Sequence, residues 1–70
     1  MKSIIGIILS VYMDENDSNM IGFKIKINNK IIDIIVPVDD YNSKIYKDDK
    51  VIIYGDIINN KKKVKIRLYE

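Results

Sequence analysis

GFKIKINNKIIDIIVP, residues 22–37, predicts two β-strands joined by a tight turn at Asn28 and Asn29. Asn tolerates the positive φ that two-residue hairpin turns require. Such a turn sets the register, because residues equally far from it on the two strands lie opposite each other. One face of the hairpin then pairs Ile25 with Ile32, Phe23 with Ile34 and Ile21 with Val36. The opposite face pairs Lys24 with Asp33, Lys26 with Ile31 and Gly22 with Ile35.

The purely apolar face of this hairpin is predicted to be the core face. A shift of one residue in the register would bring lysines inside, because the side chains of a strand alternate between its two faces. On the other face, the pair of Lys24 and Asp33 joins opposite charges across the strands, which is mildly favourable. We therefore expect strands over residues 20–27 and 30–38, with Ile25 and Ile32 in the core and Lys24 exposed.

The C-terminal segment follows the same rule. Residues 50–58 and 63–70 predict two strands around a turn at Asn59 and Asn60. The apolar face pairs Val51 with Leu68, Ile53 with Ile66 and Gly55 with Val64. The other face pairs Tyr54 with Lys65, Ile52 with Arg67 and Asp56 with Lys63. We expect Ile53 and Ile66 in the core and Lys65 on the surface.

A first strand is predicted over residues 3–13, but both of its faces are rich in isoleucine. One face carries Ile5, Ile7, Leu9 and Val11, and the other carries Ile4, Gly6, Ile8, Ser10 and Tyr12. We expect the second face, with Ile4 and Ile8, to be the outer one. A glycine such as Gly6 inside a strand indicates a bulge or a sharp bend. The polar residues 14–19 are expected to form a loop after this strand.

Residues 38–49 are polar and alternate poorly, so they predict a short interruption between the third and fourth strands. One or two helical turns fit this length. Ile45 and Tyr46 are the apolar residues that this segment offers to the core.

The composition restricts the class of function. The 70 residues form one domain, residues 1–70, with a formal net charge of +2 and with no His or Cys. The usual general base, the thiol nucleophile and the common zinc ligands are therefore absent. Adjacent acidic pairs, as at residues 39–40 and 48–49, more often cap turns than hold a metal ion. We expect a non-catalytic protein, not an enzyme, with no metal and no cofactor.

No run of the sequence approaches the roughly 20 apolar residues of a membrane span. Lys2 precedes an apolar run, as in a signal peptide, but the run is short and no small-residue cleavage site follows it. A strand explains the same residues better. We expect a cytoplasmic protein without a membrane partner.

The order of three strands, a short interruption and two strands resembles the OB-fold. It is most similar to the small domains related to replication protein A and to the anticodon-binding domains. Gly6–Val11 and the run D-D-K-V-x-I-x-G at Asp48–Gly55 carry the likeness, and Asp48 stands where the family commonly has Gly. The resemblance implies an all-β, five-stranded Greek-key barrel that is partly open, with a binding face on strands two and three between two loops. An SH3-like barrel is the alternative fold.

Carried over to this sequence, the resemblance implies a binding face made by strands two and three. That face consists of Lys24, Lys26, Ile31, Asp33 and Ile35, and the flanking loops are residues 14–19 and 59–63. Domains of this fold bind single strands by joining a positive groove to aromatic stacking platforms. The register leaves no aromatic side chain on this face, so binding is expected to be mainly electrostatic.

We therefore expect a binding module for single-stranded nucleic acid, DNA or RNA. The candidate nucleic-acid-binding residues are Lys24, Lys26, Lys61, Lys62, Lys63, Lys65, Arg67 and Tyr54. The alternative is a protein-interaction or assembly domain that binds a protein partner or a second copy of the chain. Its interface residues are Ile31, Ile35 and Ile52, in an outer set that also includes Ile4, Ile8 and Ile58. Strands with one solvated face are usually polar there, so outward isoleucines favour an interface.

Overall fold

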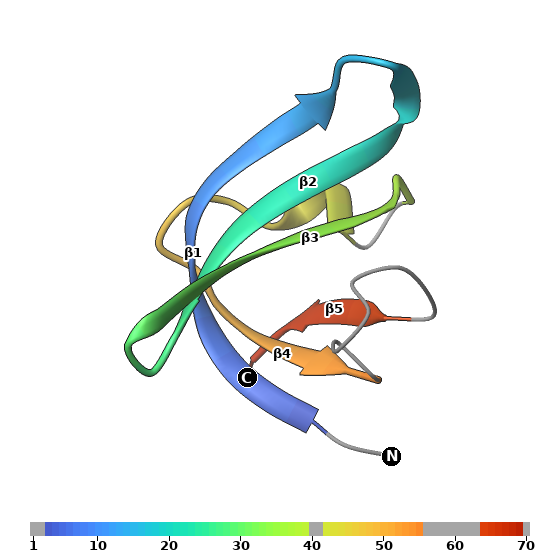
Figure 1. Ribbon diagram of the computed structural model, residues 1–70. Coiled ribbons are helices and arrows are strands. Elements are labelled where there is room, and N and C mark those ends of the chain that lie inside the picture. Colours follow the sequence, from blue (N-terminus) through green and yellow to red (C-terminus); the bar gives the residue numbers. More distant parts are fainter. Residues whose placement is uncertain (1–2, 40–41, 56–63, 70) are drawn as a thin grey trace.

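The structure is a computed structural model that describes residues 3–39, 42–55 and 64–69. It is all-β, with five antiparallel strands in one sheet of order β3-β2-β1-β4-β5 (Figure 1). The strands are β1 (Ser3–Asp14), β2 (Asp17–Ile27), β3 (Lys30–Pro37), β4 (Lys50–Tyr54) and β5 (Lys65–Leu68). A single 3₁₀ turn, η1 (Asn42–Lys44), lies between β3 and β4, as expected from the sequence.

The β2–β3 hairpin has the predicted register throughout. All six predicted pairs are present, including Phe23 with Ile34 and Lys24 with Asp33. Asn28 begins the turn with a φ of 55°, the left-handed conformation that Asn tolerates. Ile25 is fully buried and Lys24 is exposed, as predicted, while Ile32 is half-buried against the core.

The β4–β5 hairpin also has the predicted register, over a shorter length. Its ladder pairs Val51 with Leu68, Ile52 with Arg67, Ile53 with Ile66 and Tyr54 with Lys65. The expected pair of Gly55 and Val64 is not part of it, because Gly55 adopts a φ of 113° that ends the strand. The expected pair of Asp56 and Lys63, the turn at residues 59–60 and Ile58 lie outside the described residues.

The faces of β1 differ from the prediction. Ile8 is completely buried opposite Ile25, so its expected place on the outer face was wrong. Ile4 is half-buried and pairs with the core residue Ile53, whereas Ile5 and Ile7 are exposed. The pattern was uninformative because both faces of this strand are apolar. Pairing with β2 and β4, which come later in the chain, decides which face is buried.

Leu9 is the extra residue of a bulge in β1. The register with β2 shifts between Ile8 and Ser10, so Val11 lies on the same side of the sheet as Ile8. Gly6 is buried before the bulge, and a Cβ there would collide with the side chain of Ile25. The bulge is therefore not at Gly6 but three residues later, and Gly6 instead permits a close approach of β1 to β2.

The β1–β2 hairpin is longer than predicted, because β2 begins at Asp17 and not near residue 20. Asp14 pairs with Asp17, and only two residues separate the strands. The Asp14 carboxylate accepts a hydrogen bond from the Asn16 N–H at 3.1 Å, and the Asp17 carboxylate accepts one from the Asn19 N–H at 2.9 Å. The polar side chains that predicted a loop therefore stabilise a tight turn. This turn lies at the tip of the β1–β2 hairpin, which projects from the rest of the molecule (Figure 1).

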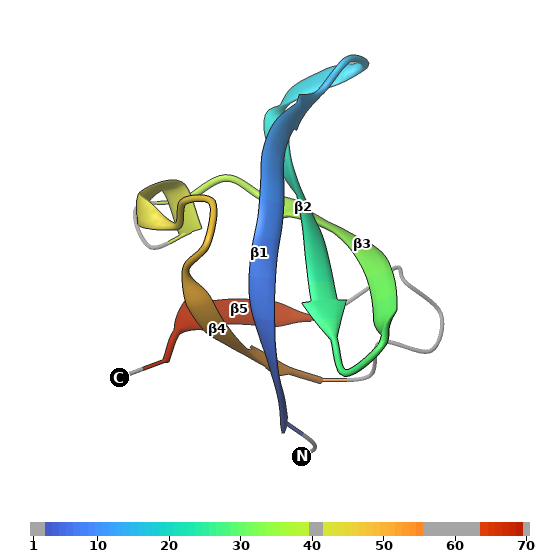
Figure 2. The same cartoon turned by 90° about the vertical axis from the view of Figure 1, so that its left-hand side faces the viewer.

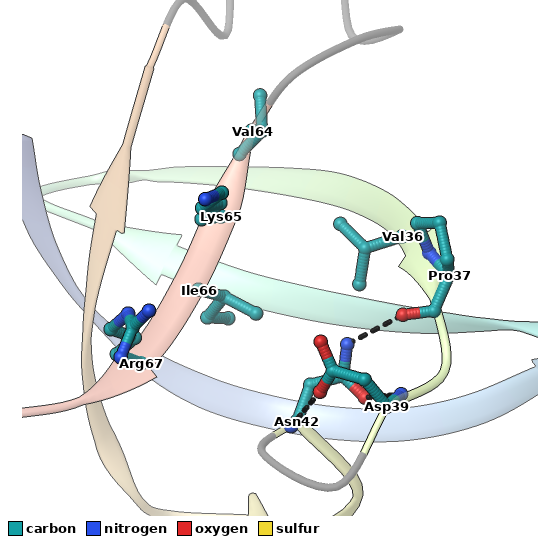
Figure 3. Close-up of a pocket in the computed structure, with 8 residues that line it drawn as sticks. All are labelled: Val36, Pro37, Asp39, Asn42, Val64, Lys65, Ile66 and Arg67. Atoms are coloured by element: carbon teal, nitrogen blue, oxygen red, sulfur yellow. Dashed lines mark hydrogen bonds between the residues drawn. The ribbon is translucent and has the colours of Figure 1, made fainter.

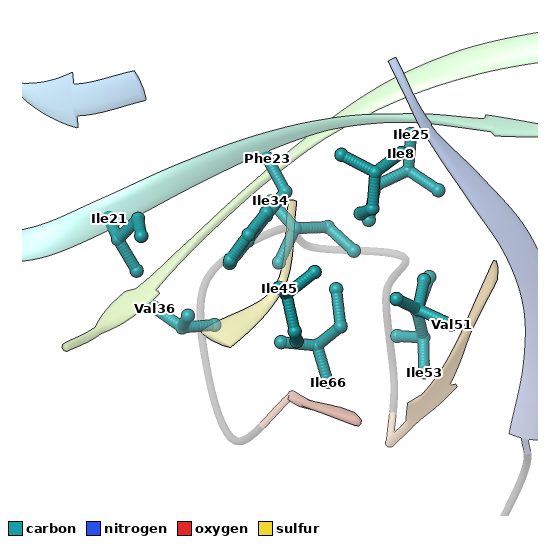
Figure 4. Packing of buried hydrophobic residues seen from close by; sticks show 10 residues of the cluster. All are labelled: Ile8, Ile21, Phe23, Ile25, Ile34, Val36, Ile45, Val51, Ile53 and Ile66. Atoms are coloured by element: carbon teal, nitrogen blue, oxygen red, sulfur yellow. The ribbon is translucent and has the colours of Figure 1, made fainter. Parts of the chain in front are cut away.

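The core lies between the two hairpins. Ten apolar residues of the described segments form it: Ile8, Ile21, Phe23, Ile25, Ile34, Val36, Ile45, Val51, Ile53 and Ile66 (Figure 4). Ile45, directly after η1, points into this cluster as predicted. Tyr46 is 65% exposed, so the expectation that it also fills the core was wrong. Ile45 and Tyr46 point in different directions after η1, and Ile45 is the one of the two that packs in the core.

Polar contacts fasten the segment between β3 and β4. The Asn42 N–H donates to the Asp39 carboxylate at 2.8 Å, and the Asp39 N–H donates to Asn42 Oδ1 at 3.0 Å. Asp48 has a φ of 73°, and its N–H donates to the carbonyl oxygen of Ile8 at 2.8 Å. The Ile8 N–H in turn donates to the Asp49 carbonyl oxygen at 2.9 Å. These bonds hold the turn before β4 against the bulge of β1.

β3 and β5 are the two edges of the sheet. They form no ladder with each other in the described part of the chain, so the sheet is not closed into a barrel there. In the strand order β1 lies between the β2–β3 hairpin and the β4–β5 hairpin. Figure 2 shows β2 and β3 to the right of β1, with β5 overlapping β1 in this view. Among the same residues, no helix has the length and hydropathy needed to cross a membrane.

Candidate nucleic-acid interface

The outer face of β1, β2 and β3 brings together all five residues of the predicted binding face. Lys24 and Lys26 are exposed on β2, and Asp33 is exposed on β3 opposite Lys24. Ile31 and Ile35, on the same side of β3, are 60% and 42% exposed. The hairpin register alone positions these five side chains. We call this surface, with Tyr12 of β1, the β1–β3 face.

Tyr12 supplies the aromatic side chain that the hairpin register alone did not place on this face. It lies opposite Gly22 in the β1–β2 ladder, and its ring covers the place where a Cβ of Gly22 would stand. Its hydroxyl donates a hydrogen bond to Asp33 Oδ1 on β3 at 3.3 Å. The ring therefore lies across β2, next to Lys24, and remains 36% exposed.

Sequence reasoning missed this position because it considered only aromatic residues that belong to strands two and three. Tyr12 belongs to the first strand and reaches the face from the side. Gly22 was the available signal. A glycine on the outer side of a strand, with no function in a turn, indicates a close approach by another group.

The environment of Tyr12 favours its neutral form. Partial burial raises the pKa of its hydroxyl above the ordinary value of 10.0, and the negative charge of Asp33 and its hydrogen bond raise it further. Asp14 adds a smaller electrostatic effect in the same direction. Because the pKa of Tyr12 is higher in the folded state than in the unfolded state, the protonated hydroxyl stabilises the fold at neutral pH. This stabilisation is lost as the pH rises through the folded-state pKa.

Asp33→Asn is expected to lower the pKa of Tyr12, because it removes the nearest negative charge. The pKa should remain above 10.0, since burial is unchanged and is the larger cause. The measurement is a pH titration of the Tyr12 ring resonances by NMR. Asp17→Asn is the matched control, because the Asp17 carboxylate bonds the Asn19 N–H instead. An Asp33→Asn protein with the wild-type Tyr12 pKa would contradict this account.

A row of side chains extends the β1–β3 face toward β4. Lys26 pairs with Ile7 of β1, and Ile7 pairs with Lys50 of β4. The Lys50 Nζ lies 4.8 Å from the centre of the Tyr69 ring, within the range of a cation–π interaction. Sequence reasoning did not select Lys50 or Tyr69, because their nearness to Lys26 depends on the β1–β4 ladder.

The remaining predicted basic residues lie elsewhere. Lys65 and Arg67 are exposed on β5, beside the half-buried Tyr54 and Ile52 of β4. β1 and β4 both lie between β2 and β5, so these cations do not join Lys24 and Lys26 in one cluster. The predicted set is therefore divided into two groups. Lys61, Lys62 and Lys63 lie outside the described residues.

The described acidic residues provide no cluster of three or more that is suited to a metal ion. No protein-family model matches the chain, and neither a curated protein nor a solved structure matches it.

Proposed function

We propose that this protein is a non-catalytic module that binds single-stranded nucleic acid on the β1–β3 face. The observation that carries the proposal is the ring of Tyr12, which lies over Gly22 beside Lys24. Bases stack on exposed aromatic rings whatever their sequence, and lysines beside the ring bind the phosphates. Lys26 and Lys50 continue the positive charge along the same face. Neither an imidazole nor a thiol is present in the chain to support catalysis.

We further propose that the sheet is an OB-like Greek-key barrel left open between β3 and β5. β1 pairs with both β2 and β4, and η1 lies between β3 and β4. Asp48 has a left-handed φ of 73° at the position where the family commonly has Gly. A helical turn before β4 favours this fold over an SH3-like barrel, in which the helical turn typically precedes the last strand.

The alternative function, a protein interface, is supported by the exposed isoleucines of the same face. Ile31, Ile35 and Ile5 are the most exposed of them, whereas Ile52 is half-buried. Isoleucines on the solvated side of an antiparallel sheet are unusual. These isoleucines are scattered among lysines, however. Such a surface also suits single-stranded nucleic acid, with the apolar side chains against its bases and the lysines against its phosphates.

A titration distinguishes these two functions. A fluorescein-labelled oligothymidylate and its oligouridylate counterpart are titrated at two salt concentrations, and polarisation is measured. We expect a Kd of roughly 1–100 µM near physiological salt, as for non-specific binding, and an affinity that falls as salt increases. Sedimentation of the protein alone is the second measurement. Absence of binding at low salt, together with self-association, would favour the protein interface and reject the nucleic-acid proposal.

A further inference from the structure

Asp33 carries the negative charge of the β1–β3 face. It lies in the middle of β3, exposed and directly opposite Lys24. A carboxylate at this position repels the phosphates that the neighbouring lysines attract, so it weakens the electrostatic part of nucleic-acid binding. A phosphate-binding surface alone would be better served by a neutral residue here.

The acidic side chains of the turns have a different function. Each of four accepts a backbone N–H from a residue two or three positions away: Asp14, Asp17, Asp39 and Asp49. Asp39 borders a pocket of about 370 Å³ between the end of β3 and β5, where Asn42 Nδ2 also donates to the Pro37 carbonyl oxygen (Figure 3). The Asp33 carboxylate differs, because it accepts a hydrogen bond from a side chain on another strand, the hydroxyl of Tyr12.

Asp33 lies at the hydroxyl end of the Tyr12 ring. The ring crosses β2 over Gly22, and its hydroxyl donates to Asp33 Oδ1 at 3.3 Å. A base that stacks on the solvent side of this ring therefore has one edge beside the Asp33 carboxylate. A carboxylate offers about four acceptor positions, and Tyr12 uses one of them. Asp33 thus keeps the capacity to accept hydrogen bonds from a stacked base.

A carboxylate distinguishes bases by the donors on their Watson–Crick edges, which a single strand leaves accessible. Guanine presents two donors side by side, N1–H and the 2-amino group, and these match the two oxygens of a carboxylate. Adenine and cytosine present an amino group next to an unprotonated ring nitrogen, whose lone pair the carboxylate repels. Thymine and uracil present one N–H between two carbonyl oxygens. Guanine alone therefore makes the bidentate, charge-assisted pair, which is the stronger kind of hydrogen bonding.

We propose that the β1–β3 face prefers guanine and that Asp33 is its specificity-determining residue. This inference rests on the proposed nucleic-acid function and adds base selection to it. The guanine stacks on Tyr12, its N1–H and 2-amino group donate to the Asp33 carboxylate, and Lys24 binds a neighbouring phosphate. Stacking alone accepts every base, so the preference comes from Asp33.

Trinucleotides with thymine at both ends test this preference. The central base is guanine, hypoxanthine, adenine or thymine, and the Tyr12 ring resonances of the full chain are followed by NMR at low salt. Guanine should bind about fivefold tighter than adenine, at the lower end of the discrimination expected of a bidentate contact. Adenine is matched in ring size, so stacking does not account for the difference. Hypoxanthine keeps N1–H but lacks the 2-amino group, and its affinity should lie between the two. Equal binding of guanine and adenine would overturn the proposal.

Two variants separate recognition of the base from positioning of the ring. Asp33→Asn replaces one acceptor oxygen by an NH2 donor, so the ratio of guanine to adenine affinity should fall below about twofold. Tyr12→Phe loses only the hydrogen bond to Asp33 and keeps both ring and carboxylate, so the ratio should persist. Asp33 is exposed, and circular dichroism checks that each variant is folded. If Asp33→Asn changes the affinity of every trinucleotide by the same factor, Asp33 only positions the ring or repels phosphate, and the proposal fails.

The same titrations distinguish failure of this inference from failure of the proposed function. If guanine and adenine bind equally while Tyr12→Ala weakens both, the nucleic-acid site stands and only the base selection is rejected. If the wild-type chain binds neither the trinucleotides nor oligothymidylate at low salt, the proposed function and the guanine preference are both rejected.

Discussion

Phe23→Ala is expected to unfold this protein or to leave it marginally stable. Phe23 is completely buried at the centre of the core, where it pairs with Ile34 on one side and Val11 on the other. Truncation of a buried Phe costs about 3–5 kcal/mol, because apolar burial is lost and a cavity remains. A chain of 70 residues has a free energy of unfolding of roughly 4–10 kcal/mol. This one substitution therefore removes a large part of the free energy of unfolding.

Urea denaturation followed by circular dichroism measures this loss. Ile31→Ala is the matched control, because Ile31 lies on the neighbouring strand and is 60% exposed. It should change the free energy of unfolding by roughly 0.5 kcal/mol or less, as surface substitutions do. The predicted core residue Ile53 gives a second test, and Ile53→Ala should cost about 2–5 kcal/mol. Similar losses for Phe23→Ala and Ile31→Ala would contradict the assignment of the two faces.

Tyr12→Ala is expected to weaken the binding of single-stranded oligonucleotides by roughly 5- to 150-fold. Stacking of one base on an aromatic ring contributes about 1–3 kcal/mol, and each 1.4 kcal/mol is a tenfold change in affinity. Tyr12→Phe should keep most of the affinity, because the ring remains and only the hydrogen bond to Asp33 is lost. The measurement is the polarisation titration with oligothymidylate at constant salt.

Gly22→Ala tests the same platform without removal of the ring. A Cβ at Gly22 would occupy the position of the Tyr12 ring, so the ring must move away from β2. The affinity should then fall in the same direction as for Tyr12→Ala. Tyr46→Ala is the control, because Tyr46 is an exposed tyrosine that lies outside the β1–β3 face. If Tyr54→Ala weakens binding and Tyr12→Ala does not, the cations of β5 form the nucleic-acid site instead.

The registers of the β2–β3 and β4–β5 hairpins and most of the core were predictable from the sequence. Asn28 and Asn29 mark the turn between β2 and β3, and the side chains of a strand alternate with a period of two. With the turn placed, the burial of Ile25 and the exposure of Lys24 follow from counting. The β4–β5 ladder follows in the same way, including the pairs of Ile53 with Ile66 and Tyr54 with Lys65. These are contacts between segments close in sequence, and local pattern is sufficient for them.

Only the tertiary structure decided the orientation of β1 and the composition of the sites. Both faces of β1 are apolar, so the burial of Ile8 depends on its pairing with β2 and on the turn before β4. The same ladder places Tyr12 over Gly22 and, through the β1–β4 pairing, aligns Lys50 with Lys26. The strand order separates the cations of β5 from those of β2 and leaves the β5 edge beside a pocket. Each of these features joins segments distant in sequence, and periodicity within a single strand carries no information about which other strand becomes its neighbour.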